Sequence, residues 1–254
     1  MAYTYYYSDA VTALQDIIKR SVEEEKASIL CNIATNKIWS RYDWRESLAK
    51  LPPFYLIPLM QDYGQPFTVV PSDLLGLREV YWVRTTATPP AREPVTVFRD
   101  LPETHIRSLP HAICVLPAIN LPATKPKFRV FPRIPDNIGS TDYMIDGTYK
   151  KRPTKITQAN MQTSLLPWDD IYFNTFLETL KWACWQLAGD GRAGAVQVDR
   201  GNSVYTGQMA VMYDSIDGMA IAEGLNLGDT VVAPNEALVA PPAINSGATL
   251  GWGQ

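Results

Sequence analysis

The sequence predicts an α+β protein in which a proline-rich β lobe is inserted between two helical regions. Three observations predict this class. Residues 8–50 contain no proline and carry apolar side chains at helical spacing. Residues 52–158 hold 16 of the 20 prolines, placed between short runs of β-branched and aromatic residues. Residues 165–228 return to helical spacing, so the helices of both ends are expected to pack as one bundle.

The first helical region has a start signal and a stop signal. Ser8 or Asp9 is expected to cap a helix that starts at Ala10, because short polar side chains accept hydrogen bonds from the first free backbone amides. Apolar side chains from Val11 onward then recur at helical spacing. Proline cannot continue a helix, so the pair at residues 52–53 ends this region.

The middle region predicts a small sandwich or barrel of short strands. Prolines between the strands should confine many of them to edges or bends. One strand is expected to be broken by Asp146 and Gly147. The predicted strands are residues 54–57, 67–70, 79–83, 94–98, 127–131 and 143–157.

The third region predicts two more helices. Pro167 and the acidic residues that follow it mark the start of the first helix. Gly189 is expected to end this helix. The glycine-rich residues 189–194 follow a helix, which favours a turn over a phosphate-binding loop. The second helix is expected to begin near Ser203 and to stop at Gly224.

Residues 229–254 are expected to form an extended C-terminal arm. From residue 230 onward they hold one charged side chain, Glu236, and three prolines. This composition is poor for a helix and favours an extended path. Apolar side chains that such an arm would carry include Leu238, Ile244, Leu250 and Trp252.

Composition narrows the function classes. The formal net charge is −3, so the chain as a whole is not a polycation that seeks nucleic acid. Three scattered cysteines and two histidines indicate neither a disulfide framework nor a zinc site, and no cofactor is predicted. The first residues lack the pattern of a signal peptide, so synthesis in a cytoplasm is expected, without insertion into a membrane.

The sequence does not predict an enzyme. It contains no phosphate-binding glycine loop and no nucleophile elbow. Asp214 and Asp217 would share a helix face and have the residue type for acid–base or metal chemistry. Asp169 and Asp170 form a second, adjacent pair of carboxylates. Such pairs are more simply interpreted as solvated surface.

A basic cluster lies between residues 124 and 155, interleaved with aromatic residues. It is suited either to gripping phosphates or to pairing with an acidic neighbour. Residues 156–254 supply such a neighbour, with ten acids against three bases. Identical subunits in a ring bring different regions of the chain together, so pairing between subunits is the favoured interpretation. The cluster comprises Lys125, Lys127, Arg129, Arg133, Lys150, Lys151, Arg152 and Lys155.

Two blocks of the chain carry a resemblance to a known family. The first is NKIWSRYDWR at residues 36–45, followed by LPPFYLIP at 51–58 and QDY at 61–63. The second is LAGDGRAG at residues 187–194, followed by YTGQ at 205–208, IDGM at 216–219 and EG at 223–224. With FP at 131–132 and YKKRP at 149–153, these blocks resemble the head-to-tail adaptor (connector, or head-completion) proteins of tailed bacteriophages over residues 10–229.

The resemblance implies a structural virion protein at the head–tail junction. Such a protein forms a ring, commonly of twelve copies, between the portal protein and a tail nozzle or tail-tube protein. Genomic DNA passes through its lumen without sequence-specific binding. Portal binding is then expected from Leu238, Ile244, Leu250 and Trp252 in the arm. Residues Asp214, Asp217, Lys150, Lys151 and Arg152 are expected at the subunit interface or the lumen.

Three other functions compete with this interpretation. One is a different structural component of a phage tail, such as a nozzle, tube or fibre. A second is a glycan hydrolase that uses two carboxylates facing each other in a cleft. A third is a nucleic-acid-binding module built on residues 125–155, whose binding would depend steeply on salt.

Overall fold

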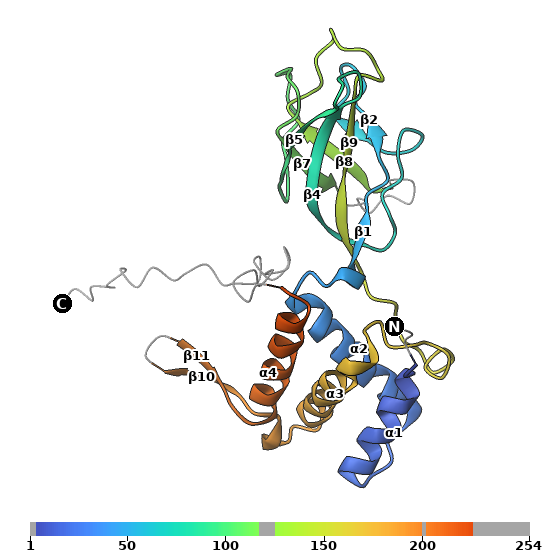
Figure 1. The fold of residues 1–254 in the computed structure, drawn as a ribbon, viewed down its shortest axis with the longest axis vertical. Coiled ribbons are helices and arrows are strands. Elements are labelled where there is room, and N and C mark those ends of the chain that lie inside the picture. The colour runs from blue at the N-terminus through green and yellow to red at the C-terminus, as the bar shows by residue number, and fades with distance from the viewer. Residues whose placement is uncertain (1–3, 117–124, 200–201, 226–254) are drawn as a thin grey trace, which may run out of the picture.

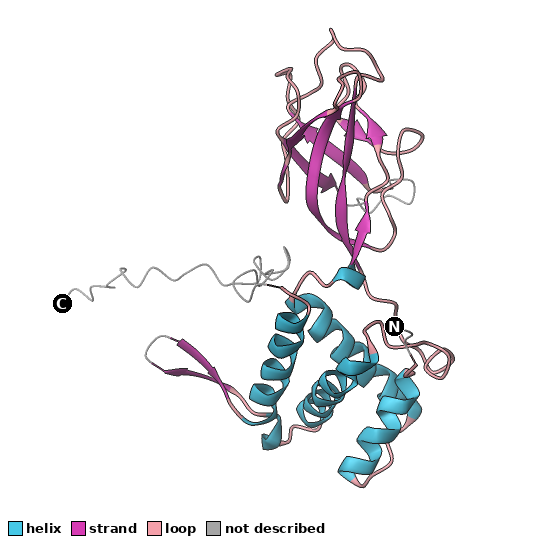
Figure 2. Cartoon of the chain, in the orientation of Figure 1, coloured by secondary structure: helices cyan, strands magenta, loops and turns pink. Residues whose placement is uncertain are grey.

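The computed structural model describes residues 4–116, 125–199 and 202–225 (Figure 1). Their fold is mixed α+β, as the sequence predicts. The molecule is elongated, with the α-helices gathered at one end of its long axis and the two larger sheets at the other (Figure 2). The chain crosses between these ends twice, once before β1 (Leu48–Lys50) and once after β9 (Tyr143–Lys151).

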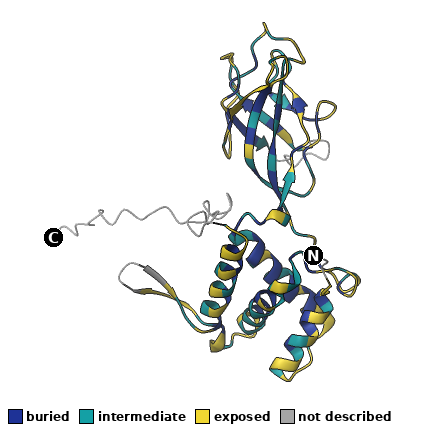
Figure 3. Cartoon of the chain, in the orientation of Figure 1, coloured by how far each residue is buried: buried dark blue, intermediate teal, exposed yellow. Residues whose placement is uncertain are grey.

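Four α-helices within the described residues share one buried core: α1 (Tyr7–Ile18), α2 (Glu24–Arg41), α3 (Phe173–Leu187) and α4 (Gly207–Ala222). Their buried side chains recur at helical spacing and line the inner sides of the helices (Figure 3). Leu14, Ile38, Phe176, Leu180 and Ile216 are all at most 1% exposed in this core. The helical part therefore joins segments from distant regions of the sequence.

The predicted helix boundaries need two corrections. Helix α1 begins at Tyr7 with Tyr6 as its N-cap, and Asp9 lies inside the first turn, where its carboxylate accepts a hydrogen bond from the Tyr6 amide at 2.8 Å. The prediction that a helix begins near Ser203 is wrong. A hairpin of β10 (Val196–Asp199) and β11 (Asn202–Tyr205) lies there, and α4 follows it.

Two sheets form the β part of the molecule. The larger pairs β1, β2 (Phe54–Tyr55), β4 (Leu74–Arg84), β5 (Ala91–Pro94) and β9. The smaller pairs β3 (Asp62–Tyr63), β6 (Thr96–Val97), β7 (Ala112–Leu116) and β8 (Lys127–Phe131). Phe54 and Ile145 of the larger sheet share a core with Tyr63, Ile113 and Phe128 of the smaller one, so the two sheets bury a common interior.

The strand predictions are partly wrong. Residues 67–70 form no strand, and β1, β3 and β7 were not predicted. Asp146 and Gly147 do not break β9, because the irregularity falls on β4, whose register shifts between Leu77 and Val80. A Cβ atom at Gly147 would lie 2.2 Å from the Glu79 carbonyl oxygen, so the glycine allows the two strands to approach closely.

Candidate functional site

A buried ion pair joins the helical part to the β part. The Lys150 ammonium group, on β9, has a fully buried side chain and lies 3.1 Å from a carboxylate oxygen of Asp43, which follows α2. It also donates a hydrogen bond to the Tyr42 carbonyl oxygen at 2.7 Å. Arg78 of β4 approaches the other Asp43 oxygen at 2.6 Å. Lys150 was predicted at the subunit interface or the lumen, but its side chain is fully buried at the junction inside the chain.

Asp217 also has partners within the chain. Its carboxylate accepts hydrogen bonds from the Arg41 guanidinium at 3.3 Å and from the Tyr42 hydroxyl at 2.6 Å. Burial, together with the hydrogen bond to Asp217, raises the pKa of Tyr42 to about 12. These contacts tie α4 to the end of α2. Asp217 is therefore a packing contact between helices, with its side chain 29% exposed.

Asp214 has a different environment from Asp217. It is exposed on α4 and has no ion pair with any of the described residues. Val211 and Ile221 are 46% and 60% exposed on the same helix. Residues at positions 211, 214 and 221 share one side of a helix, so Asp214 lies between two exposed apolar side chains on the outer side of α4.

Lys151 and Arg152 line a pocket of about 690 Å³ beside the junction. The Arg152 amide donates a hydrogen bond to the Asp73 carbonyl oxygen at 2.6 Å, and the Tyr149 hydroxyl donates one to the Asp73 carboxylate at 3.0 Å. Neither basic side chain forms an ion pair with the described residues. These two bases are therefore available to an acidic group of a partner, in a pocket that Glu46 and Asp73 also line. It is lined by Tyr7, Trp39, Glu46, Ser72, Asp73, Lys151, Arg152, Pro153, Thr154, Ile156, Ser164, Leu165 and Pro167.

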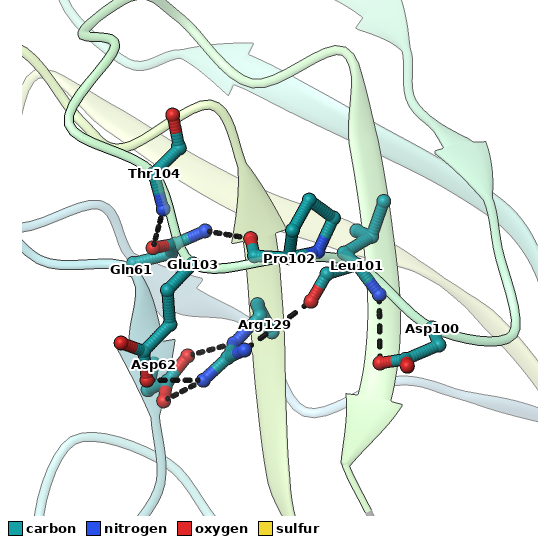
Figure 4. Close-up of polar contacts among 8 residues, drawn as sticks. All are labelled: Gln61, Asp62, Asp100, Leu101, Pro102, Glu103, Thr104 and Arg129. Atoms are coloured by element: carbon teal, nitrogen blue, oxygen red, sulfur yellow. Dashed lines mark hydrogen bonds and ion pairs between the residues drawn. The ribbon is translucent and has the colours of Figure 1, made fainter.

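Arg129, from the same basic cluster, forms its ion pairs inside the β part. Figure 4 shows its guanidinium against Asp62 of β3 and Glu103 of the loop between β6 and β7. The distances are 2.6 Å to Asp62 and 3.1 Å to Glu103. Hydrogen bonds to Asp62 are the main cause that raises the pKa of Arg129. Gln61 binds the same loop through the Pro102 carbonyl oxygen at 3.0 Å. Arg129 thus fixes a loop and is not available to a phosphate.

The remaining members of the basic cluster are dispersed. Lys125 donates a hydrogen bond to Gln65 at 2.6 Å, and Lys127 is exposed near Gly64. Lys155 is exposed and lines a separate pocket with Ile29 and Ile33. Arg133 lies in a bridge with Arg107. The structure therefore does not gather the predicted cluster into one phosphate-binding surface.

The hairpin β10–β11 was missed by sequence reasoning, although its base carries a signal. Gly194 has a φ of +84°, and a Cβ atom there would lie 1.7 Å from the Thr206 carbonyl oxygen. Thr206 and Ala195 close the base through three hydrogen bonds of 3.0–3.1 Å. Glycines at positions 194 and 207 flank a segment that contains three valines, and this pattern could have predicted a hairpin.

The turn before the hairpin is equally well fixed. The Asp190 carboxylate accepts hydrogen bonds from the Arg192 backbone amide at 2.9 Å and from its guanidinium at 2.6–3.1 Å. These bonds hold the pKa of Asp190 at about 2, well below its ordinary range. The Arg192 guanidinium lies over the Trp185 ring at 5.0 Å. The glycine-rich segment at 189–194 therefore has a structural role as the turn that precedes the hairpin.

The other titratable candidates are separated from one another. Asp170 accepts hydrogen bonds from the Thr4 amide and hydroxyl, which lower its pKa. His105 and His111 are exposed. Burial raises the pKa of the Cys31 thiol to about 12. Among the described residues, no group of three or more such side chains is arranged to hold a metal ion.

The four predicted portal-binding residues, Leu238, Ile244, Leu250 and Trp252, lie outside the described residues. Within residues 4–225, apart from the two gaps, no helix is long and apolar enough to cross a membrane. No protein-family model matches the chain, and no curated protein is similar enough to count as a relative.

Proposed function

We propose that the chain is a structural virion protein, a head-to-tail adaptor that forms a ring between the portal and the tail of a tailed bacteriophage. The observation that carries this proposal is the two-ended architecture. The helices and the larger sheets have separate cores at opposite ends of the long axis, joined by a short polar junction (Figure 2). A protein that links two assemblies needs two separate surfaces, and this arrangement provides them.

In this proposal residues 8–50 and 165–228 form the helical bundle, residues 52–158 the inserted β lobe and residues 229–254 the arm. DNA passes through the lumen, where acidic side chains repel it and keep it mobile. The portal binds the arm, and a nozzle or tail-tube protein binds below the ring. The resemblance of residues 36–63 and 187–224 to such adaptors supports the same conclusion.

The test is to locate the chain in an assembled particle. The gene is fused to a compact tag at an exposed loop of the β lobe, and tagged particles are imaged by electron microscopy. The proposal expects added density in a ring at the head–tail junction. Density distributed along the tail, or at its distal end, would instead identify a tube, nozzle or fibre component. A chain absent from particles would overturn the proposal.

A further inference from the structure

The hairpin β10–β11 exposes apolar side chains that the described chain does not cover. Val196, Val198 and Val204 are 53%, 76% and 42% exposed. The two strands pair with each other alone, and Figure 1 shows them projecting away from the helices. A two-stranded hairpin is marginally stable in water unless it packs on another surface. A covering surface is therefore expected from another chain.

The hairpin and α4 each expose apolar side chains, and α4 also exposes the acidic Asp214. Both lie on the same side of the helical part in Figure 1. Val211 and Ile221 are exposed on α4, with Asp214 between them. We name this surface, formed by β10–β11 and the outer side of α4, the hairpin face. The base of the hairpin is fixed by the contacts of Gly194 and Thr206.

A second apolar surface lies on the opposite side of the helical part. The N-terminal residues run beside the segment that follows β9, with a bridge between Tyr6 and Leu165. Figure 1 shows this segment and the N-terminus across the helices from the hairpin. Tyr5, Tyr6, Leu165 and Ile171 are 40%, 39%, 41% and 65% exposed there. We name this surface, together with the pocket that Leu165 lines, the pocket face.

The charges of the two faces are complementary. Lys151 and Arg152 line the pocket and have no ion pair with the described residues. Asp214, on the hairpin face, has none either. Exposed apolar groups beside an unpaired charge are typical of a surface that meets a partner of the opposite charge. The hairpin face therefore offers the acid Asp214, and the pocket face offers the bases Lys151 and Arg152 beside the acids Glu46 and Asp73.

We propose that the hairpin face of one copy of this chain binds the pocket face of the next copy. Two different faces on opposite sides of one molecule make a heterologous contact, which closes into a ring when the rotation between copies allows it. This inference rests on the proposed function and adds to it the surfaces through which the ring would assemble. It assigns Asp214, Lys151 and Arg152 to the interface and leaves Lys150 and Asp217 inside the subunit.

The test uses cysteines on both faces of the full-length chain. Val198→Cys and Leu165→Cys are introduced into a Cys184→Ser background, because Cys31 and Cys114 are buried. The purified protein is treated, at increasing protein concentration, with a short bismaleimide cross-linker. The double variant should give a ladder of dimers, trimers and larger species on a denaturing gel. A mixture of the two single variants should give dimers alone, since each copy then carries one reactive face.

Two controls make this result specific. Ile106→Cys, 64% exposed on the β part, replaces Leu165→Cys and should abolish the ladder. Adding Asp214→Lys should slow ladder formation several-fold, whereas Asp16→Lys, at an exposed acid on α1, should leave it unchanged.

Three outcomes overturn the contact: no ladder above the Ile106→Cys control, dimers from Val198→Cys alone, or equal effects of Asp214→Lys and Asp16→Lys. The proposed function is judged separately by the particle images. A ring in particles without a ladder rejects this interface alone, and a ladder without a ring in particles rejects the adaptor alone.

Discussion

At the scale of single residues, Lys150 is the most unusual group in the described chain. Lysine is rarely buried completely, because removing its charge from water is costly unless a counter-charge lies near. Lys150 meets this requirement through Asp43 and the Tyr42 carbonyl oxygen, both just beyond α2. One ammonium group therefore links β9 to the end of α2 in the other part of the molecule.

Replacing Asp43 with asparagine should destabilise the fold. Lys150 would keep its charge in a buried site without its counter-charge, and losing one partner of a buried pair costs about 3 kcal/mol. Urea unfolding followed by tryptophan fluorescence measures this loss. Asp136→Asn, which removes an exposed pair with Arg107, is the matched control and should change stability by less than about 1 kcal/mol. Equal effects of the two substitutions would contradict the role given to the junction.

Asp190 should titrate at an unusually low pH. Its pKa is held at about 2, compared with an ordinary 3.8, mainly by hydrogen bonds from Arg192. Because the folded pKa lies below the unfolded one, the stabilisation is present above the unfolded pKa and is lost as the pH falls toward 2. Carboxyl NMR of the protein should show this midpoint, and Arg192→Gln should move it upward. A midpoint that does not move would show that Arg192 is not its cause.

At the scale of elements, the hairpin depends on two glycines at its base. Gly194 and Gly207 approach each other so closely that a Cβ atom at position 207 would lie 2.9 Å from the Gly194 Cα atom. Both have positive φ, at +84° and +59°, where other residues are strained. The chain can leave α3, form the hairpin and re-enter α4 because these positions have no side chain.

Substituting Gly194 with alanine should release the hairpin. The added methyl group would collide with the Thr206 carbonyl oxygen, so the base must open at a cost of roughly 1–3 kcal/mol. Hydrogen exchange should then become fast at β10 and β11 while the cores stay protected. Gly191→Ala is the control, since nothing lies within 4 Å of its added Cβ atom. Unchanged exchange at the hairpin in Gly194→Ala would rule out this account of the base.

At the scale of the whole molecule, exposed apolar surface at both sides of the helical part indicates that the isolated chain is incomplete. Under the proposed function, we expect the purified chain to be mainly monomeric at low concentration and to assemble when portal is added. The portal would supply contacts that the weak self-contact lacks. Analytical ultracentrifugation with and without portal measures this. A stable closed ring without portal would contradict the expectation.

The arm gives a separate prediction. A chain truncated after Asp229 should fold normally, because the described cores contain no later residue. It should fail to attach to portal-bearing heads, since it lacks Leu250 and Trp252. Circular dichroism checks folding, and co-sedimentation with heads checks attachment. Attachment equal to that of the full chain would show that the arm does not bind the portal.

The sequence by itself determined the α+β class and much of the helical core. Apolar side chains such as Leu14, Ile38 and Leu180 recur at a period that a helix places on one side, and their burial follows. The strand at residues 127–131 was likewise predicted with its exact bounds, because β-branched and aromatic residues alternate there. Short strands such as β1 and β3 were missed, since two or three residues carry no periodicity.

The tertiary structure alone decided which charges meet. Arg129 and Lys150 look equivalent in the sequence, as members of one basic cluster. In the fold, Arg129 pairs with Asp62 and Lys150 pairs with Asp43, both far away in the sequence. Lys151 and Arg152 have no such partner among the described residues. Charge pairing depends on distances of a few ångströms between residues far apart in the chain. The local sequence pattern carries no information about those distances. Only the fold therefore shows which charged residues pair inside the chain and which are left for a partner.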